Sequence, residues 1–293
     1  MANSIELFKK NAPELLDRVY KSIATTADFD MNGALVKAGA NANEIIIPKL
    51  SMDGLGDYSR NSGYTDGNIT LNNETVKFNY ERGRRLKTDA IDNEETGGVI
   101  MANLSSEFLR TKVVPEIDAV RYATYSALDG ITDVASAGVT YADGQAVLTA
   151  LESAMAKMTN DEVPEEDRHL RITSDLLSKA QYVARNVNND ILTKFASVKV
   201  VPQSRFYTAI ELNDGVSEGE KIGGYKKAST GKDINFMIIH KPALLQYTKH
   251  AKMKIFTPEQ DQDGDNYKML YRIYGLNDAY ENKVAGIVVS HKA

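Results

Sequence analysis

The stretch "NITLNNETVKFNYERGRRLKTDAIDNEET", residues 68–96, decides how the chain around it folds. Apolar and polar residues alternate over residues 69–71 and again over 76–80, which is the period of a half-buried strand. Between these runs, Asn72 and Asn73 can supply the left-handed conformations of a tight turn. The stretch therefore predicts a two-stranded ribbon. Because a lone ribbon is only marginally stable in water, we expect something outside it to cover its apolar face.

The charges of the same stretch fall into two blocks. Residues 81–88 hold four basic and one acidic residue (+3), and residues 89–96 hold four acidic residues (−4). One interpretation is a solvated loop, or a ribbon that folds back and neutralises itself. The other is a ribbon that projects and lays its charges on neighbouring copies, where pairs of ~0–1 kcal/mol each set the register. The second interpretation gives these candidate inter-subunit residues: Arg82, Arg84, Arg85, Lys87, Asp89, Asp92, Glu94 and Glu95.

Composition excludes several classes of protein. The 293 residues carry a net charge of −5, which argues against a protein that grips nucleic acid through a basic excess. There is no cysteine, which excludes disulfides, thiolate metal sites and cysteine nucleophiles. The N-terminus is charged from Glu6 and lacks the apolar core of a signal peptide, and no apolar run reaches the ~18 residues that span a bilayer. We expect a soluble chain made in the cytosol, without a membrane partner.

No motif predicts an active site, a cofactor or a metal. The four histidines are scattered, without the spacing of metal ligands. "DQDGDN", residues 261–266, has its glycine in fourth place and Arg272 in twelfth, so it predicts a turn and not a calcium loop. "GGYKKASTGKD" has Asp233 where a phosphate-binding loop needs Ser or Thr, and it predicts a flexible surface loop. Carboxylate pairs stay open, because 40 acidic residues make such pairs common.

Periodicity predicts a mixed order of helices and strands. We expect a long helix that ends at Asp129-Gly130 and is bent or broken at Pro115, and a further helix after Asp143. Ser174 can cap another helix. The other predicted elements are an amphipathic helix over 4–24, a polar segment over 31–43, a strand at "EIIIP" (44–48), a loop over 51–67, strands at "HLRITS" (169–174) and "INFMIIH" (234–240), and two strands, 267–274 and 284–290, separated by a break at Gly275 and Asp278.

Three segments, in this order, resemble the major capsid proteins of tailed bacteriophages, whose architecture is called the HK97 fold. They are "TVKFNYERGRRLKTDAIDNEET", "VVPEIDAVRYATY" and "AYENKVAGIVVSHK", and they look like a Gram-positive siphophage branch of that family. The resemblance implies an α+β fold. It implies these parts: an N-terminal arm (1–45), an extended loop (46–96), a peripheral domain with a long spine helix (97–130 and 256–293) and an axial domain (131–255).

The resemblance also implies a function. The chain would be a structural protein, not an enzyme, that assembles with itself as hexamers and pentamers into an icosahedral shell around double-stranded DNA, without reading its sequence. Its further partners would be a portal and a separate scaffolding protein, with a fused stretch that has been cleaved off as the alternative to the latter. It would lie in the virion, and in the host cytoplasm during assembly.

Two other functions stay open at this point. An encapsulin, a nanocompartment of the same fold that holds cargo enzymes, has the same size. A cytosolic α/β enzyme that acts through carboxylates would instead be a monomer or small oligomer with a closed pocket. Terminase and portal genes beside this one would indicate a phage, a cargo gene would indicate an encapsulin, and size-exclusion chromatography would separate an enzyme from a shell protein.

Overall fold

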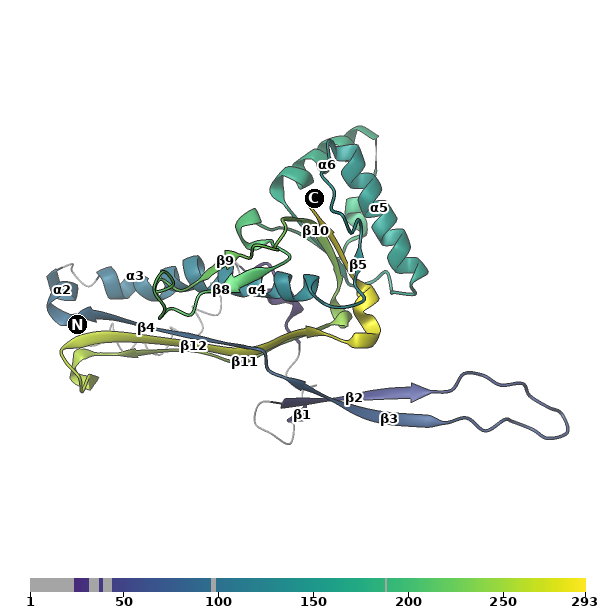
Figure 1. The fold of residues 1–293 in the computed structure, drawn as a ribbon, viewed down its shortest axis with the longest axis horizontal. Helices are drawn as coiled ribbons and strands as arrows, with labels where there is room; N and C mark the ends of the chain where they lie inside the picture. The colour runs from purple at the N-terminus through teal and green to yellow at the C-terminus, as the bar shows by residue number, and fades with distance from the viewer. Residues whose placement is uncertain (1–23, 32–36, 39–43, 96–98, 188) are drawn as a thin grey trace.

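The computed structural model describes residues 24–31, 37–38, 44–95, 99–187 and 189–293. Figure 1 shows three parts: a long flat limb, an upper body with the C-terminus, and a ribbon that projects away from both. The limb holds β4, β11 and β12 beside the helices α3 and α4, the body holds β5, β6, β7, β10 and β13 with α5 and α6, and the ribbon is β2 and β3. The predicted helix 4–24 lies outside the described residues, apart from Ala24.

The body is built around β10 (Ile234–His240), every residue of which is buried. Its sheet has the order β5-β13-β10-β6-β7, so β10 lies in the centre. Phe236 and Ile238 face the core under α5 and α6, and Met237 and Ile239 face a second core formed with α4. Burial on both faces explains the unbroken apolar run of this strand, because neither face meets water. The other elements are β5 (Thr132–Asp133), β6 (Arg168–Ile172), β7 (Ser197–Val200), β13 (Ile287–His291), α5 (Gly144–Asn160) and α6 (Ser174–Val187).

The predicted start of α5 is confirmed in detail. Asp143 has an extended backbone, and its side chain accepts a hydrogen bond from the Ala146 backbone N–H at 2.9 Å. This satisfies one of the free donors at the first turn of the helix. The predicted strand 234–240 and the helix at Ser174 are also confirmed, and "HLRITS" contains most of β6.

The limb packs a three-stranded antiparallel sheet against a long helical segment. The sheet has the order β11-β12-β4, and Tyr80, Tyr271 and Ile273 from it form a core with side chains of the helical segment, among them Val113 and Ile117. The elements are β4 (Tyr80–Asp89), β11 (Leu244–Phe256), β12 (Asn266–Ala279), α2 (Ala90–Glu95), α3 (Val99–Phe108) and α4 (Val114–Ser126). Among the described residues, none of the helices is apolar over a length that could cross a bilayer.

Pro115 disturbs the long helix, as predicted. A π-helical turn over Leu109–Val113 separates α3 from α4, and Pro115 lies in the first turn of α4. Proline has no N–H to donate and clashes with the preceding turn, and a widened turn is one way to carry a helix past it. The helix continues in spite of the proline and ends at Ser126, three residues before Asp129.

One predicted turn and one predicted strand break are wrong. The strand β3 (Ile69–Lys77) runs straight through Asn72 and Asn73, which pair with Lys49 and Pro48 of β2 (Glu44–Met52). The ribbon is therefore β2 with β3, and residues 53–68 form its tip. Pairing with a distant strand has overridden the local preference of Asn-Asn for a turn. Likewise β12 is continuous through Gly275 and Asp278, because β11 pairs with it along its length, with a bulge opposite Gly275.

A buried polar cluster joins the body to the limb through residues 24–31. The side chain of Asp118, on α4, is fully buried and accepts hydrogen bonds from the backbone N–H and the hydroxyl of both Thr25 and Thr26, and from Arg205. Arg171 of β6 donates to the Thr25 carbonyl and pairs with Asp28 at 2.6 Å. Burial alone would raise the pKa of Asp28, but Arg171 and Lys199 hold it below its usual value. We call residues 24–31 the clasp.

Candidate inter-subunit surfaces

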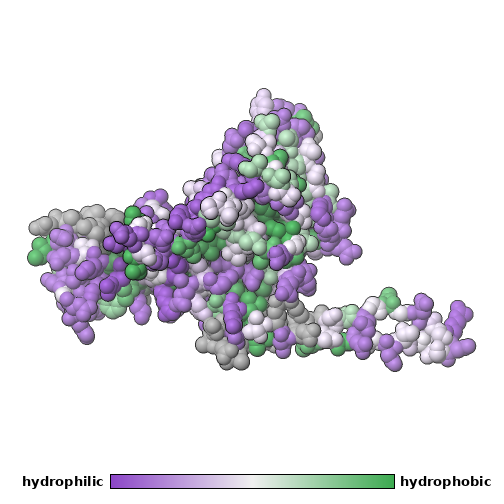
Figure 2. All heavy atoms as spheres, in the orientation of Figure 1, coloured by the Kyte–Doolittle hydropathy of each residue, from purple (hydrophilic) through white to green (hydrophobic). Residues whose placement is uncertain are grey.

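The tip of the ribbon, residues 53–68, is covered by nothing in the described chain. Every residue from 51 to 71 whose side chain is described is exposed, except the half-buried Gly63. Figures 1 and 2 show the tip standing clear of the rest of the molecule. The tip and the adjoining strand ends carry six large apolar side chains that are 61–107% exposed: Met52, Leu55, Tyr58, Tyr64, Ile69 and Leu71. Apolar side chains gathered in this way on a projecting element favour a docking function.

The end of this tip is an ordered turn. Ser59 and Gly63 exchange backbone hydrogen bonds at 2.8 and 3.1 Å, and the Ser59 hydroxyl accepts from the backbone N–H groups of Asn61 and Ser62. The rings of Tyr58 and Tyr64 meet edge to face, with centroids 4.9 Å apart. These contacts fix the shape of a surface that lacks a core of its own.

The basic block does not lie on the ribbon. It lies on β4, which pairs with β12 in the limb, so the prediction that the projecting ribbon carries these charges is wrong. The reason is that the chain leaves the ribbon at Lys77 and enters the limb sheet at Tyr80, only three residues later. Exposure alternates along β4, and this divides the block between the two faces of the sheet.

Two of the four cations, Arg82 and Arg84, face inward and bind within their own chain. Arg82 pairs with Glu116 of α4 at 2.8 Å and donates to the Asn213 carbonyl at 2.7 Å. Arg84 donates to the Lys221 carbonyl at 2.8 Å. Both carbonyls belong to the loop between β8 (Ile210–Leu212) and β9 (Tyr225–Lys227). These two arginines therefore hold that loop against the limb.

Glycine is required where this loop meets Arg84. Gly215 has a φ of +77°, and a Cβ there would lie 2.6 Å from the Arg84 Nη1. A side chain at this position would be strained by the backbone and would also displace the guanidinium. This loop, residues 213–224, shares only Gly223 and Gly224 with the stretch 223–233 that the sequence predicts to be a flexible surface loop, and part of that stretch forms β9. The loop 213–224 is anchored at one end of the hairpin, although Val216 and Ile222 stay 78 and 86% exposed.

We expect Arg84→Ala to loosen this loop without unfolding the protein. A hydrogen bond to a charged group contributes ~1.5–3 kcal/mol, and the lower end of that range suits a bond that is open to solvent. Its loss corresponds to about tenfold faster amide hydrogen exchange over residues 213–224. Hydrogen exchange followed by mass spectrometry measures this directly. Arg85→Ala, one residue along on the other face, is the matched control and should leave the exchange of the loop unchanged. Equal exchange in both variants would contradict the anchoring role of Arg84.

The other two cations, Arg85 and Lys87, are exposed on the outer face of the limb sheet. In the middle strand, β12, Leu270 lies opposite both Arg85 of β4 and Lys254 of β11. Lys252 of β11 lies opposite Arg272 of β12. Residues opposite one another in a sheet share a face, so Lys252 and Lys254 join the same surface. None of these four has an acidic partner among the described residues. We call Arg85, Lys87, Lys252 and Lys254 the basic face.

Other charges on this face are already paired. Arg272 pairs with Glu81, and Lys268 pairs with Asp261 and Asp263. The hydrogen bond from Lys268, helped by the Asp263 backbone N–H, lowers the pKa of Asp261 to about 2. The segment 261–266 is therefore a reverse turn that leads into β12, as predicted. Sequence reasoning missed Lys252 and Lys254, although their two-residue spacing in "KHAKMKIF" is the signal of one strand face.

The acidic block lies at the far end of β4. The Asp89 side chain accepts from the backbone N–H of Ile91 at 2.9 Å and so caps the short helix α2, which contains Asp92, Glu94 and Glu95. Asp89 and Glu94 are exposed. The two blocks are thus neighbours along one edge of the limb, and their contact with another copy stays a prediction. In the described part of the chain, no group of three His, Asp or Glu side chains is placed to hold a metal ion.

Comparison with known proteins identifies the architecture. Neither a family model nor a curated protein sequence matches the chain. Among solved structures, a chain from Mycobacterium phage Che8 matches with a TM-score of 0.59 and 13% identity, over 91% of this chain and 90% of that one. The capsid structure of cyanophage P-SCSP1u matches at 0.56 and 14%, over 88 and 85%. The virus-like particle from Pyrococcus furiosus matches at 0.56 and 11%, over 94 and 95%.

The chain has the HK97 capsid fold. The α+β architecture predicted from the sequence is therefore confirmed over about nine-tenths of the chain. The parts of the structure differ from the predicted domains in sequence. The limb combines β12, α3 and α4 of the predicted peripheral domain with β4 and α2 of the predicted extended loop and with β11 of the predicted axial domain. The body holds most of the predicted axial domain with β13 added, and the ribbon is the first part of the predicted extended loop. The exact domain boundaries stay a prediction.

Proposed function

We propose that this protein is a major capsid protein, a structural and non-enzymatic subunit of the head shell of a tailed bacteriophage. The observation that carries the proposal is the uncovered ribbon tip. Six large apolar side chains stand exposed on an element without a core, and each would contribute ~1.5–3 kcal/mol if another surface buried it. The HK97 fold, which phage capsids share, supplies the context in which another copy of the chain provides that surface.

The basic face is the surface that suits the tip of a neighbouring copy. Residues 53–68 contain three aspartates and one arginine, a net charge of −2, and the basic face offers four cations without acidic partners among the described residues. Charges of opposite sign set the register of a contact, and the apolar side chains of the tip supply the area. In this role Arg85 and Lys87 are inter-subunit residues, and Arg82 and Arg84 support them from within the subunit.

We expect Arg85→Glu with Lys87→Glu to prevent normal assembly and to leave the subunit folded. The double substitution changes the charge of this surface by four units, which would turn the attraction between the basic face and the ribbon tip of another copy into repulsion. Sedimentation and electron microscopy would show loss of closed particles, with an unchanged far-UV circular dichroism spectrum. Lys112→Glu with Arg185→Glu makes the same change in net charge at other exposed positions and should assemble normally. Normal particles from the first variant would contradict the role of the basic face.

The proposal also covers the symmetry of the shell, its location and its partners. Hexamers and pentamers of one chain would form an icosahedral particle in the virion, assembled in the host cytoplasm with a separate scaffolding protein and a portal. The net charge of −5 suits a wall that encloses double-stranded DNA without binding its sequence. Electron microscopy of the purified protein tests the proposal as a whole: we expect closed particles, and a monomer or small oligomer at every concentration would contradict it.

A nanocompartment shell of the encapsulin type is the second candidate. The match to a virus-like particle from Pyrococcus furiosus, over 94% of this chain, supports it, because the same fold there belongs to a particle found in an archaeon. Particles purified from the natural source separate the two functions. DNA inside the particle supports the phage head, and a co-purified enzyme supports the nanocompartment.

A further inference from the structure

A cleft in the body, formed by residues that belong neither to the ribbon tip nor to the basic face, has the features of a binding site. It has a volume of about 480 Å³, within the range of small-molecule sites. Three segments form it: the turn after α5, the end of β10, and the short helix Glu281–Gly286. Four carboxylates lie around it, and Val163, Pro164, Pro242 and Ala285 line it with apolar surface. The carboxylates are Asp161, Glu162, Glu166 and Asp167.

A buried arginine holds the acidic turn in shape. Arg168 is fully buried, and its guanidinium donates to the carbonyls of Val163 and Pro164 at 2.5 and 2.8 Å and to the Thr159 hydroxyl. The turn also contains Glu162 and Asp167 in left-handed conformations, with φ of 59 and 56°. The backbone oxygens thus point inward to Arg168. The carboxylates of the turn are left at the surface, where all four residues are exposed.

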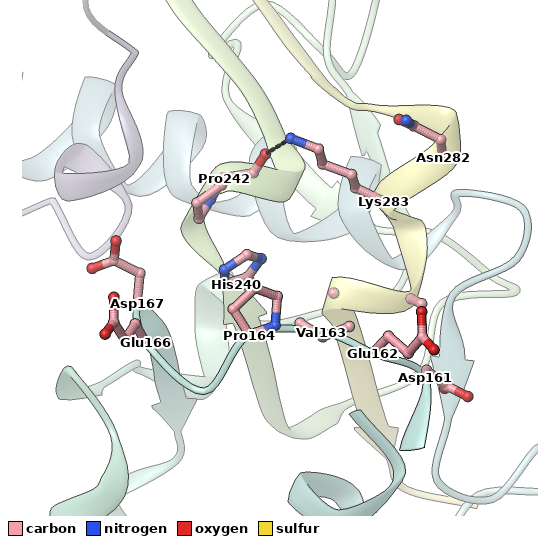
Figure 3. A pocket seen from close by; sticks show the side chains of 12 residues that line it. Asp161, Glu162, Val163, Pro164, Glu166, Asp167, His240, Pro242, Asn282 and Lys283 are labelled. Carbon is pink, nitrogen blue, oxygen red and sulfur yellow. Dashed lines mark hydrogen bonds between the residues drawn. The ribbon is translucent and has the colours of Figure 1, made fainter. Parts of the chain in front are cut away.

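The second observation is a buried histidine without a partner. His240 is only 8% exposed and lines the cleft, and no hydrogen bond reaches its imidazole from the described residues. Figure 3 shows its ring between the Glu166–Asp167 side and the Asp161–Glu162 side. Burial lowers the pKa of His240, and the charge of Arg168 lowers it further. The charge of Asp167 raises the pKa again and that of Lys283 lowers it, and the net shift is downward. The lowered pKa favours the uncharged ring, in which one nitrogen can accept a hydrogen bond.

Among the described residues that line this cleft, the one lysine or arginine, Lys283, is turned to other contacts. The Lys283 Nζ donates to the Pro242 carbonyl at 3.5 Å and lies 4.9 Å from the centre of the Tyr280 ring. Figure 3 shows this contact across the upper side of the cleft. Carboxylates around the opening, an acceptor within it and apolar walls together suit a ligand that has a cationic N–H donor at the end of an aliphatic chain.

We propose that this cleft binds an aliphatic ammonium group, carried by a linear polyamine or by a lysine side chain of a partner. The methylene groups would pack on the prolines and Val163, and the ammonium would donate to His240 and to the carboxylates of Glu166 and Asp167. A divalent metal ion is a poorer fit. Among the described residues, no three acidic or histidine side chains lie close enough together to coordinate one. This site goes beyond the proposed function and does not depend on it.

The test is a titration of the purified protein with spermidine, followed by magic-angle-spinning NMR of ¹³C-labelled histidine, which records signals from single subunits and from large particles alike. The chain has four histidines, so a His240→Gln variant assigns the relevant signal at once. We expect the His240 signal to shift and to saturate with spermidine. Glu166→Gln with Asp167→Asn should weaken binding about tenfold or more, because two charged hydrogen bonds are lost. Glu218→Gln with Glu259→Gln makes the same change in net charge at exposed positions elsewhere and should bind normally.

Two further arms complete the test. Nα-acetyl-lysine methylamide stands for a protein side chain: binding as tight as that of spermidine assigns the site to a partner's lysine, and binding of spermidine alone assigns it to free polyamines. Magnesium chloride tests for simple attraction of cations. No shift of His240 with either amine, an equal shift with magnesium, or unchanged affinity in the Glu166/Asp167 variant would each overturn the proposal. Because the titration needs no shell, its failure is distinct from a failure to assemble.

Discussion

Removal of the ribbon tip should leave a folded subunit that forms no closed particles. Met52 and Ile69 are paired in the ladder of β2 and β3, so residues 53–68 can be replaced by Asn-Gly, which closes a hairpin with a two-residue turn. The change deletes Leu55, Tyr58 and Tyr64, all exposed in the subunit. Nothing in the described core loses a contact, so circular dichroism and the melting temperature should change little. Electron microscopy should show the loss of particles.

Point substitutions within the tip test whether its apolar side chains, and not only its length, are needed for assembly. Leu55→Ser with Tyr64→Ser keeps the length of the tip but removes apolar surface worth ~1.5–3 kcal/mol per side chain on burial, so particles should form only at higher protein concentration. Tyr182 is exposed to a similar degree on α6, and Tyr182→Ser should assemble as the natural protein does. If the Asn-Gly variant builds normal shells, the ribbon tip is not the docking element.

Asp118→Ala should cost the subunit ~3–5 kcal/mol of its free energy of unfolding, the usual loss when one member of a buried charged network is removed. Asp118 accepts from Thr25, Thr26 and Arg205, and the substitution leaves these donors buried without an acceptor. Domains are typically stable by only ~5–15 kcal/mol, so the variant would be close to unfolding. Urea titration followed by circular dichroism measures the change.

The control for this prediction lies just beyond the same helix. Asp129 is exposed, and Asp129→Ala should change the stability by less than ~0.5 kcal/mol. A loss below ~1 kcal/mol for Asp118→Ala would show that the clasp adds little to stability. Thr26→Val, which removes one of the donors to Asp118, should give an intermediate loss and should be less harmful when combined with Asp118→Ala.

The sequence predicts elements whose signal is local, and it fails where a distant strand decides. The apolar run of β10, the Asp143 cap and the disturbance at Pro115 all follow from neighbours in the chain, and the structure confirms them. Asn72-Asn73 resembles a turn, but β2 pairs along it across a tip of sixteen residues. No periodicity within residues 68–96 contains that information.

The candidate site shows the same division. The charge blocks were visible in the sequence, but the alternation that turns Arg82 and Arg84 inward and Arg85 and Lys87 outward depends on which face of β4 the helix α4 covers. Lys252 and Lys254 join the basic face only because β11 pairs with β12, which pairs with β4. Asp118 and Arg168 gave no signal at all, since a charged residue inside a helix or a strand is usually exposed.

The place of β13 in the body bears on how a cell makes this protein. Ile287–His291 comes after the other four strands of its sheet in the chain, yet it lies inside the sheet, between β5 and β10, with all five residues buried. A ribosome delivers β13 after the other four strands of this sheet, so until then β10 has one edge open and the two cores beside it are incomplete. A polypeptide cut short before Ile287 would stay unfolded and open to proteolysis. Under the proposed function, truncated products would thus be removed before they could enter a particle as defective subunits.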